Sequence, residues 1–68
     1  MGSYYVNKNS QPNGDHEVHV STCSRLPLSE NRNYLGVFEN CRDAVREAKK
    51  NFATADGCYY CSNACHKQ

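Results

Sequence analysis

Two short pairs of metal-binding residues constrain this chain more than any other feature of its sequence. Cys58 and Cys61 are separated by two residues, and His19 and Cys23 by three. Such short spacings allow both side chains of a pair to reach one ion from a single loop. Since three thiolates and one imidazole are a common structural zinc set, the sequence predicts a closed Zn²⁺ site made by these four residues. Residues 24–57 lie between the pairs, so a folded insert must bring them together.

The fourth ligand is the open point of this prediction. Cys65 and His66 follow Cys61 closely and compete with His19 for the position. In a regular strand over residues 15–20, His19 points away from the core face that holds Val18, so His19 requires the strand to end near Val18. In order of preference, the candidates for the fourth ligand are His19, His66, Cys65 and His16.

The size and charge of the chain limit what else it can be. Its 68 residues suffice for a single small domain, with residues 1–3 expected to be disordered or foreign to the natural chain. Domains of this size are commonly held together by a metal or by disulfides. With 8 Lys and Arg against 7 Asp and Glu, no strong electrostatic field selects nucleic acid or membrane. No long apolar run and no secretory signal are visible, which predicts a cytoplasmic protein without a membrane partner.

Five cysteines leave two alternatives to the zinc site. Their odd number argues against a closed disulfide framework, as does the expected reducing compartment. The alternatives are a thiol-based redox or enzyme-like role of Cys58, Cys61 and Cys65, and a metal-free domain bridged by disulfides. Cys41 is expected to be a small buried hydrophobe on the apolar face of a helix.

An α+β fold follows from the hydrophobic pattern. Residues 4–6, 15–20 and 34–38 have the composition or alternation of strands. A helix begins after Asn40, which is a good N-cap. Its apolar stripe consists of Cys41, Ala44, Val45, Ala48 and Phe52. We therefore expect a three-stranded antiparallel sheet with one helix packed on a face, stapled by the metal site.

The other face of this helix is charged. Asp43 with Arg46, and Glu47 with Lys50, are spaced as pairs of opposite charge, which favours a solvated surface. The alternative is a nucleic-acid contact, and it rests on Arg42, Arg46, Lys49 and Lys50. Tyr59 and Tyr60 are expected to cover the metal site and the sheet, with base stacking as their alternative role.

The chain resembles a group of short uncharacterised bacterial proteins that begin with a Tyr-Tyr-Val-Asn strand. The resemblance rests on the stretches NGDHEVH at residues 13–19, YLGVF at 34–38 and GCYYC at 57–61. It covers nearly the whole chain and implies no established activity.

More distantly, the chain is similar to the zinc-binding domain of Ada-type DNA repair proteins and related Ada-like metal-binding modules. The shared order is a strand, a pair with three intervening residues, a second strand, a helix and a C-x2-C pair. This resemblance implies His19, Cys23, Cys58 and Cys61 as zinc ligands. In the repair proteins the first cysteine accepts a methyl group, and His19 at that position cannot, so the resemblance implies a fold and a metal site without methyl transfer.

No catalytic residues are predicted. The sequence lacks a Ser/His/Asp order, a phosphate-cradling glycine loop and a recognisable carboxylate pair. We therefore expect a non-enzymatic zinc-binding module that binds a protein or nucleic-acid partner, with its oligomeric state left open.

Overall fold

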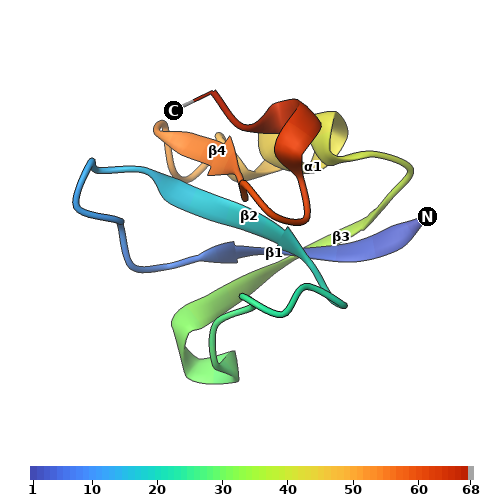
Figure 1. Ribbon diagram of the computed structural model, residues 1–68, viewed down its shortest axis with the longest axis horizontal. Coiled ribbons are helices and arrows are strands. Elements are labelled where there is room, and N and C mark those ends of the chain that lie inside the picture. Colours follow the sequence, from blue (N-terminus) through green and yellow to red (C-terminus); the bar gives the residue numbers. More distant parts are fainter. Residues whose placement is uncertain (68) are drawn as a thin grey trace.

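One mixed sheet and one helix make up the fold (Figure 1). The computed structural model describes residues 1–67. The strands are β1 (Gly2–Asn7), β2 (His16–Val20), β3 (Arg32–Phe38) and β4 (Ala55–Gly57), and the helix is α1 (Cys41–Ala48). Short 3₁₀ turns occur at Ser29–Asn31 and Asn63–Cys65. The strand order is β3-β1-β2-β4, with β1 antiparallel to both of its neighbours and β4 parallel to β2.

The fourth strand corrects the prediction of three antiparallel strands, while the α+β class with one helix is confirmed. Ala55, Asp56 and Gly57 show no strand pattern in the sequence. They become extended because they pair with β2, where His16 faces Ala55 and Val18 faces Gly57. At the other end of the chain, β1 starts at Gly2, so residues 2 and 3 belong to the sheet.

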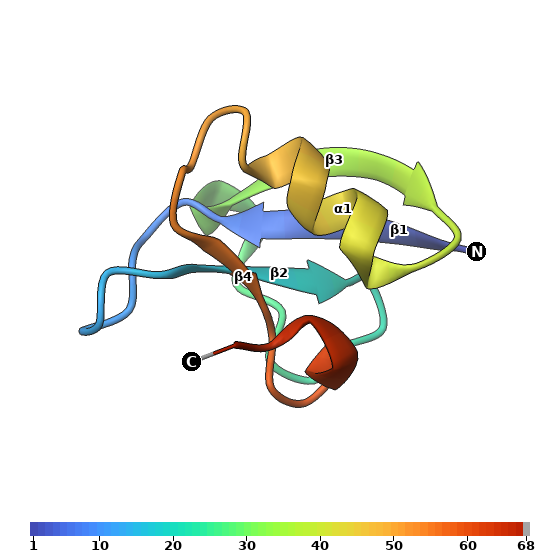
Figure 2. The same ribbon diagram turned by 90° about the horizontal axis from the view of Figure 1, so that it is seen from above.

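Helix α1 covers one face of the sheet (Figure 2). Asn40 is its N-cap, and the side-chain oxygen accepts a hydrogen bond from the Asp43 amide at 3.0 Å, as predicted. The helix ends at Ala48, earlier than the apolar stripe suggested. Phe52 lies beyond the helix end and still packs against the core. At eight residues, α1 is too short to cross a lipid bilayer, and the described residues contain no longer helix.

The hydrophobic core lies between α1 and the sheet. Val6 and Val18 of the two central strands contact Ala44 and Ala48 of the helix, and all four are at most 1% exposed. Larger side chains surround this centre only partly buried, so the core is small. A core of this size leaves the segments after β2 and after β4 to be held by other means.

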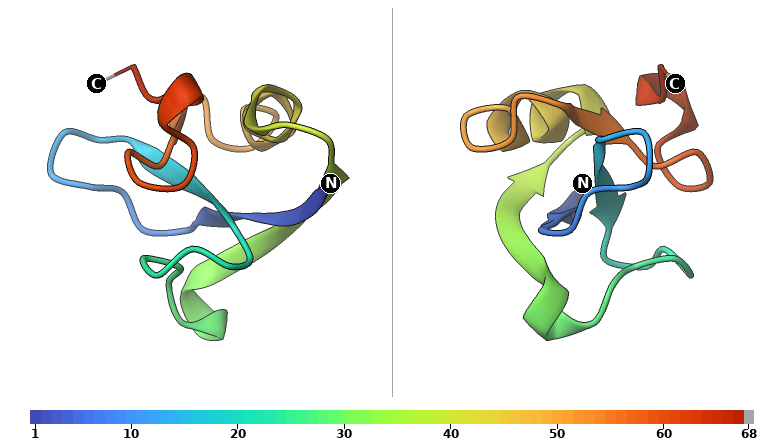
Figure 3. Two further views of the ribbon diagram at one scale, coloured as in Figure 1. Left: turned by 45° about the vertical axis from the view of Figure 1, so that its right-hand side comes forward. Right: turned by 90° about the vertical axis from the view of Figure 1, so that its left-hand side faces the viewer.

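These two segments meet beyond the ends of their strands. Figure 3 shows the segment after β2 on the opposite side of the sheet from α1. Because β2 and β4 are parallel, their carboxyl ends lie at the same edge of the sheet. The predicted insert between the two pairs is therefore real: β3 and α1 fold between Cys23 and Cys58 and return the chain to β2.

Candidate metal centre

The register between β2 and β4 places the first cysteine of the C-x2-C pair beside His19. Val18 faces Gly57 in the parallel ladder, and the Cys58 amide donates a hydrogen bond to the Val18 carbonyl at 3.0 Å. The next residues along the two chains are therefore His19 and Cys58. The pairing of β2 with β4 thus brings one member of each candidate ligand pair together.

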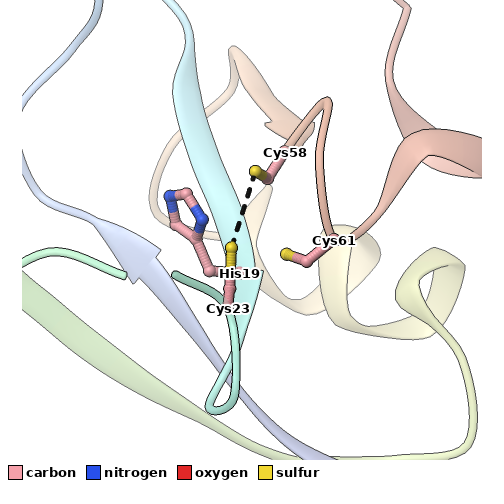
Figure 4. A group of neighbouring side chains, drawn as sticks. All are labelled: His19, Cys23, Cys58 and Cys61. Carbon is pink, nitrogen blue, oxygen red and sulfur yellow. Dashed lines mark hydrogen bonds between the residues drawn. The ribbon is translucent and has the colours of Figure 1, made fainter. Parts of the chain in front are cut away.

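Four side chains converge at this point (Figure 4). His19 comes from β2, Cys23 from the segment that follows it, and Cys58 and Cys61 from the loop after β4. Their candidate ligand atoms all lie within 4.8 Å of one another, so the cluster could hold a metal ion. The Sγ atoms of Cys23 and Cys58 are 3.9 Å apart, against about 3.8 Å for the edge of a tetrahedron with metal–sulfur bonds of about 2.3 Å.

His19 is the buried member whose polar atoms lack partners. The residue is 1% exposed, and neither ring nitrogen has a hydrogen-bond partner among the described residues. Nε2 lies 3.6 Å from the Glu17 Oε1 atom, which is too far for a good hydrogen bond. Burial lowers the pKa of His19, which favours the neutral imidazole that binds metals. In Figure 4 one ring nitrogen faces the sulfurs, and a metal there would satisfy it.

Each of the three free sulfurs accepts a hydrogen bond from a backbone amide. The amide-to-sulfur pairs are Arg25 to Cys23, Tyr60 to Cys58 and Val20 to Cys61, each at 3.4 Å. Amide donors stabilise the thiolate form that a metal requires. Two of the donors lie two residues after their cysteine, so the local turns themselves provide the hydrogen bonds.

Without a metal, two of these thiols are held neutral. Burial raises the pKa of Cys23 to about 12 and also raises the pKa of Cys58, while the amide hydrogen bonds lower both. Desolvation is the larger of the two effects because the charged thiolate loses its water shell. Metal binding must therefore release protons from this cluster.

The expectation that β2 ends near Val18 is wrong. The strand continues to Val20, and His19 does face away from the side of Val18, as strand alternation requires. His19 is nevertheless buried, because both faces of β2 are covered. Helix α1 covers the Val18 face, and the candidate metal centre lies on the other.

Cys41 and Cys65 form a disulfide, which corrects two sequence expectations. Cys41 is not a free buried thiol, and Cys65 is not available as a metal ligand. The bond joins the first residue of α1 to the 3₁₀ turn near the end of the chain. A signal for it exists in the sequence: once three of five cysteines are assigned to a metal, two remain to pair.

The other two histidines lie outside the cluster. His66 Nδ1 lies 3.0 Å from the Gly57 carbonyl oxygen and 3.4 Å from Asp56 Oδ2. His16 Nδ1 lies 3.0 Å from the Asn7 carbonyl oxygen, and its ring packs against Phe52 with 4.4 Å between centroids. The structure thus brings together the first-ranked set and none of the runner-up ligands.

Two sets of residues for which the sequence suggested a surface role are exposed: the tyrosines between Cys58 and Cys61, and the basic residues of α1 and the turn after it. Tyr59 and Tyr60 are 56% and 60% exposed, so neither side chain belongs to the core. The predicted ion pairs along α1 and the turn that follows it are present, with 3.5 Å between Asp43 and Arg46 and 3.0 Å between Glu47 and Lys50. Three of the four residues proposed for nucleic-acid contact, Arg42, Arg46 and Lys49, line one hollow, and Lys50 lies outside it.

Comparisons with family models, with curated proteins and with solved structures give no match. The resemblance to Ada-type modules therefore stays a prediction, and the function must be argued from the site itself.

Proposed function

We propose that this chain is a small non-enzymatic module stabilised by a structural Zn²⁺ ion, which binds a protein or nucleic-acid partner. The ligands are His19, Cys23, Cys58 and Cys61. One observation carries the proposal: a buried imidazole without a hydrogen-bond partner faces three thiols, and each thiol already accepts an amide hydrogen bond.

The donor set favours zinc in a structural role. Three thiolates and one imidazole complete a tetrahedron, whereas catalytic zinc usually has three protein ligands and an open position for water. Soft thiolate ligands disfavour magnesium and calcium. The ion would connect the end of β2 to the loop after β4, the two segments that the small core does not hold.

The loops that carry the ligands also carry the surface we assign to the partner. Tyr59 and Tyr60 lie between two ligands, and Arg25 lies two residues after a third. The Arg25 guanidinium lies 4.1 Å from the centroid of the Tyr60 ring. Exposed tyrosine and arginine side chains are frequent in interfaces with proteins and with single-stranded nucleic acids. Metal binding would therefore fix both the loops and this surface.

Native mass spectrometry, with and without reductant, tests the metal and the thiol state together. We expect one zinc per chain. After the zinc is accounted for, the mass of the chain should be two hydrogens below that of the fully reduced chain, and a reductant should restore these two hydrogens. A chelator should abolish amide dispersion in the NMR spectrum, and added zinc should restore it. A metal-free protein that retains its fold, or a mass lower by four hydrogens, would contradict the proposal.

A thiol-based role is the second candidate. The disulfide between Cys41 and Cys65 favours it, because it shows that cysteines of this chain can form a disulfide within the fold. Alkylation followed by peptide mapping separates the two functions. A structural site predicts that Cys58 and Cys61 are protected in the zinc-loaded protein and react after chelation. Rapid modification of either cysteine with zinc bound would instead support a nucleophilic role.

A further inference from the structure

A hollow of about 370 Å³ lies between α1 and the C-terminal segment. One wall is formed by the exposed face of the helix. The other wall is formed by Asp56 of β4 and by residues 64, 65 and 67. Its volume is at the lower end of the range of small-molecule sites, which suits a ligand the size of a mononucleotide.

The lining of this hollow is strongly basic. Arg42 and Arg46 are spaced by four residues, so they lie on one face of α1, and Lys49, the C-cap residue, follows Arg46 by three. Lys67 adds a fourth positive charge from the opposite wall. Asp56 contributes a negative charge to the lining. Its two carboxylate oxygens accept hydrogen bonds from the Lys67 amide at 3.1 and 3.0 Å.

Most of these cations lack a protein partner. Among residues 1–67, no carboxylate lies within 4.0 Å of the charged groups of Arg42, Lys49 or Lys67. Arg46 has only the exposed pair with Asp43. Exposed pairs of this kind are weak and leave Arg46 available to an anion.

The position of Arg42 also indicates an anion. It is the second residue of α1, at the positive end of the helix dipole, where a positive side chain is unfavourable. A bound anion would reverse this repulsion. The Cys41–Cys65 disulfide joins the two walls beside the hollow, so their spacing is fixed before a ligand arrives.

We propose that this hollow binds a small ligand carrying a phosphate group. Two guanidinium groups provide the forked geometry that matches phosphate oxygens, and the two lysines add charge. Val45 and Ala64 supply apolar lining for the remainder of the ligand. This site is separate from the candidate metal centre, and its occupation does not depend on the identity of the metal.

Titration of the ¹⁵N-labelled, metal-loaded protein with adenosine monophosphate tests this site at constant ionic strength. We expect saturable amide shifts at Arg42, Val45 and Ala64. Adenosine, which lacks the phosphate, should bind at least tenfold more weakly. Inorganic phosphate should shift the same amides, which separates recognition of the phosphate from recognition of the base.

Charge-removing variants provide the matched comparison. The double variant Arg42→Gln/Lys49→Gln should weaken binding at least tenfold. Lys50→Gln, in the turn just after α1 and outside the hollow, should stay within twofold of the wild-type affinity. All these positions are exposed, so amide dispersion should show that each variant folds.

Two results would overturn the proposal. In the first, the double variant and Lys50→Gln weaken binding equally, which is the behaviour of a diffuse charge effect. In the second, a single-stranded ten-nucleotide oligomer binds more than tenfold more tightly than adenosine monophosphate and shifts Tyr59 and Tyr60 as well. That outcome would assign the basic face to nucleic acid.

Discussion

The molecule uses its five cysteines in two different ways. Cys41 and Cys65 form a covalent bond that ties the start of α1 to the C-terminal segment. Cys23, Cys58 and Cys61 remain thiols and meet His19 at the end of β2. The disulfide joins α1 to the 3₁₀ turn at Asn63–Cys65, whereas the cluster lies on the face of β2 opposite α1.

The difference between these two sites lies in what each requires of its surroundings. The disulfide needs only two side chains and an oxidant. The cluster has desolvated thiols, amide donors aimed at each sulfur and an unpartnered imidazole, all of which suit an ion. The two sites should therefore respond to different reagents, one to a reductant and the other to a chelator.

Removing a metal ligand should have the largest effect. Cys58→Ser or His19→Ala should leave the protein unfolded at 25 °C. Structural zinc sites supply on the order of 10–16 kcal/mol, which exceeds the stability of most small domains. Circular dichroism and zinc content measure this, and Ser24→Ala, in the segment after β2, is the control. Retention of the native spectrum by both ligand variants would remove the structural role of the cluster.

Removing the disulfide should cost less and should leave the metal in place. The double variant Cys41→Ala/Cys65→Ala opens a loop with a sequence separation of 24, which should lower the free energy of unfolding by about 3 kcal/mol. Denaturant unfolding of the variant, and of the wild type with reductant, should agree. Loss of zinc from this variant would show that Cys65 takes part in metal binding after all.

Acidification should weaken the metal site and spare the disulfide. The raised pKa values of Cys23 and Cys58 mean that both thiols are protonated at neutral pH without metal, so each releases a proton on binding. Zinc affinity should therefore fall at least about a hundredfold for each unit of pH decrease near neutrality. Competition titrations with a chromophoric chelator at pH 6 and 7 measure this slope. A pH-independent affinity would mean that the thiolates are already formed in the metal-free protein.

A smaller effect is expected at the residue next to the ring of His19. With the metal on one ring nitrogen, the Glu17 carboxylate near Nε2 would orient the imidazole. Glu17→Gln should lower zinc affinity by roughly 10–100-fold without changing the ligand set. Glu30→Gln, in the exposed 3₁₀ turn, is the matched control. Equal affinities of the two variants would show that Glu17 does not position the ring.

The sequence predicted the local features of the fold well because their causes are local. Asn40 caps α1 through its own side chain, and the short spacings around Cys23 and Cys58 concern single loops. The α+β class followed from the same kind of pattern. Strand β4 was missed because Ala55, Asp56 and Gly57 become extended only when they pair with β2.

The disulfide and the orientation of His19 depend on contacts between distant segments. Cys41 fits the apolar stripe of the helix equally well as a free thiol, so periodicity cannot distinguish the two states. Strand alternation correctly indicated that His19 faces away from Val18, but only the fold shows that the second face is also buried. The exposure of Tyr59 and Tyr60 could likewise not be predicted, since it depends on how the loop after β4 turns in the fold.

The parallel pairing of β2 with β4 also has a consequence for the order of events during synthesis. His19 and Cys23 leave the ribosome before Cys58, which follows Cys23 by 35 residues. At about 5–20 residues per second, this is a delay on the order of 2–7 s. Over that interval the nascent chain contains only two of the four members of the cluster. High-affinity metal capture therefore waits until the last strand has docked, and a bound ion would mark a chain whose synthesis has passed Cys61.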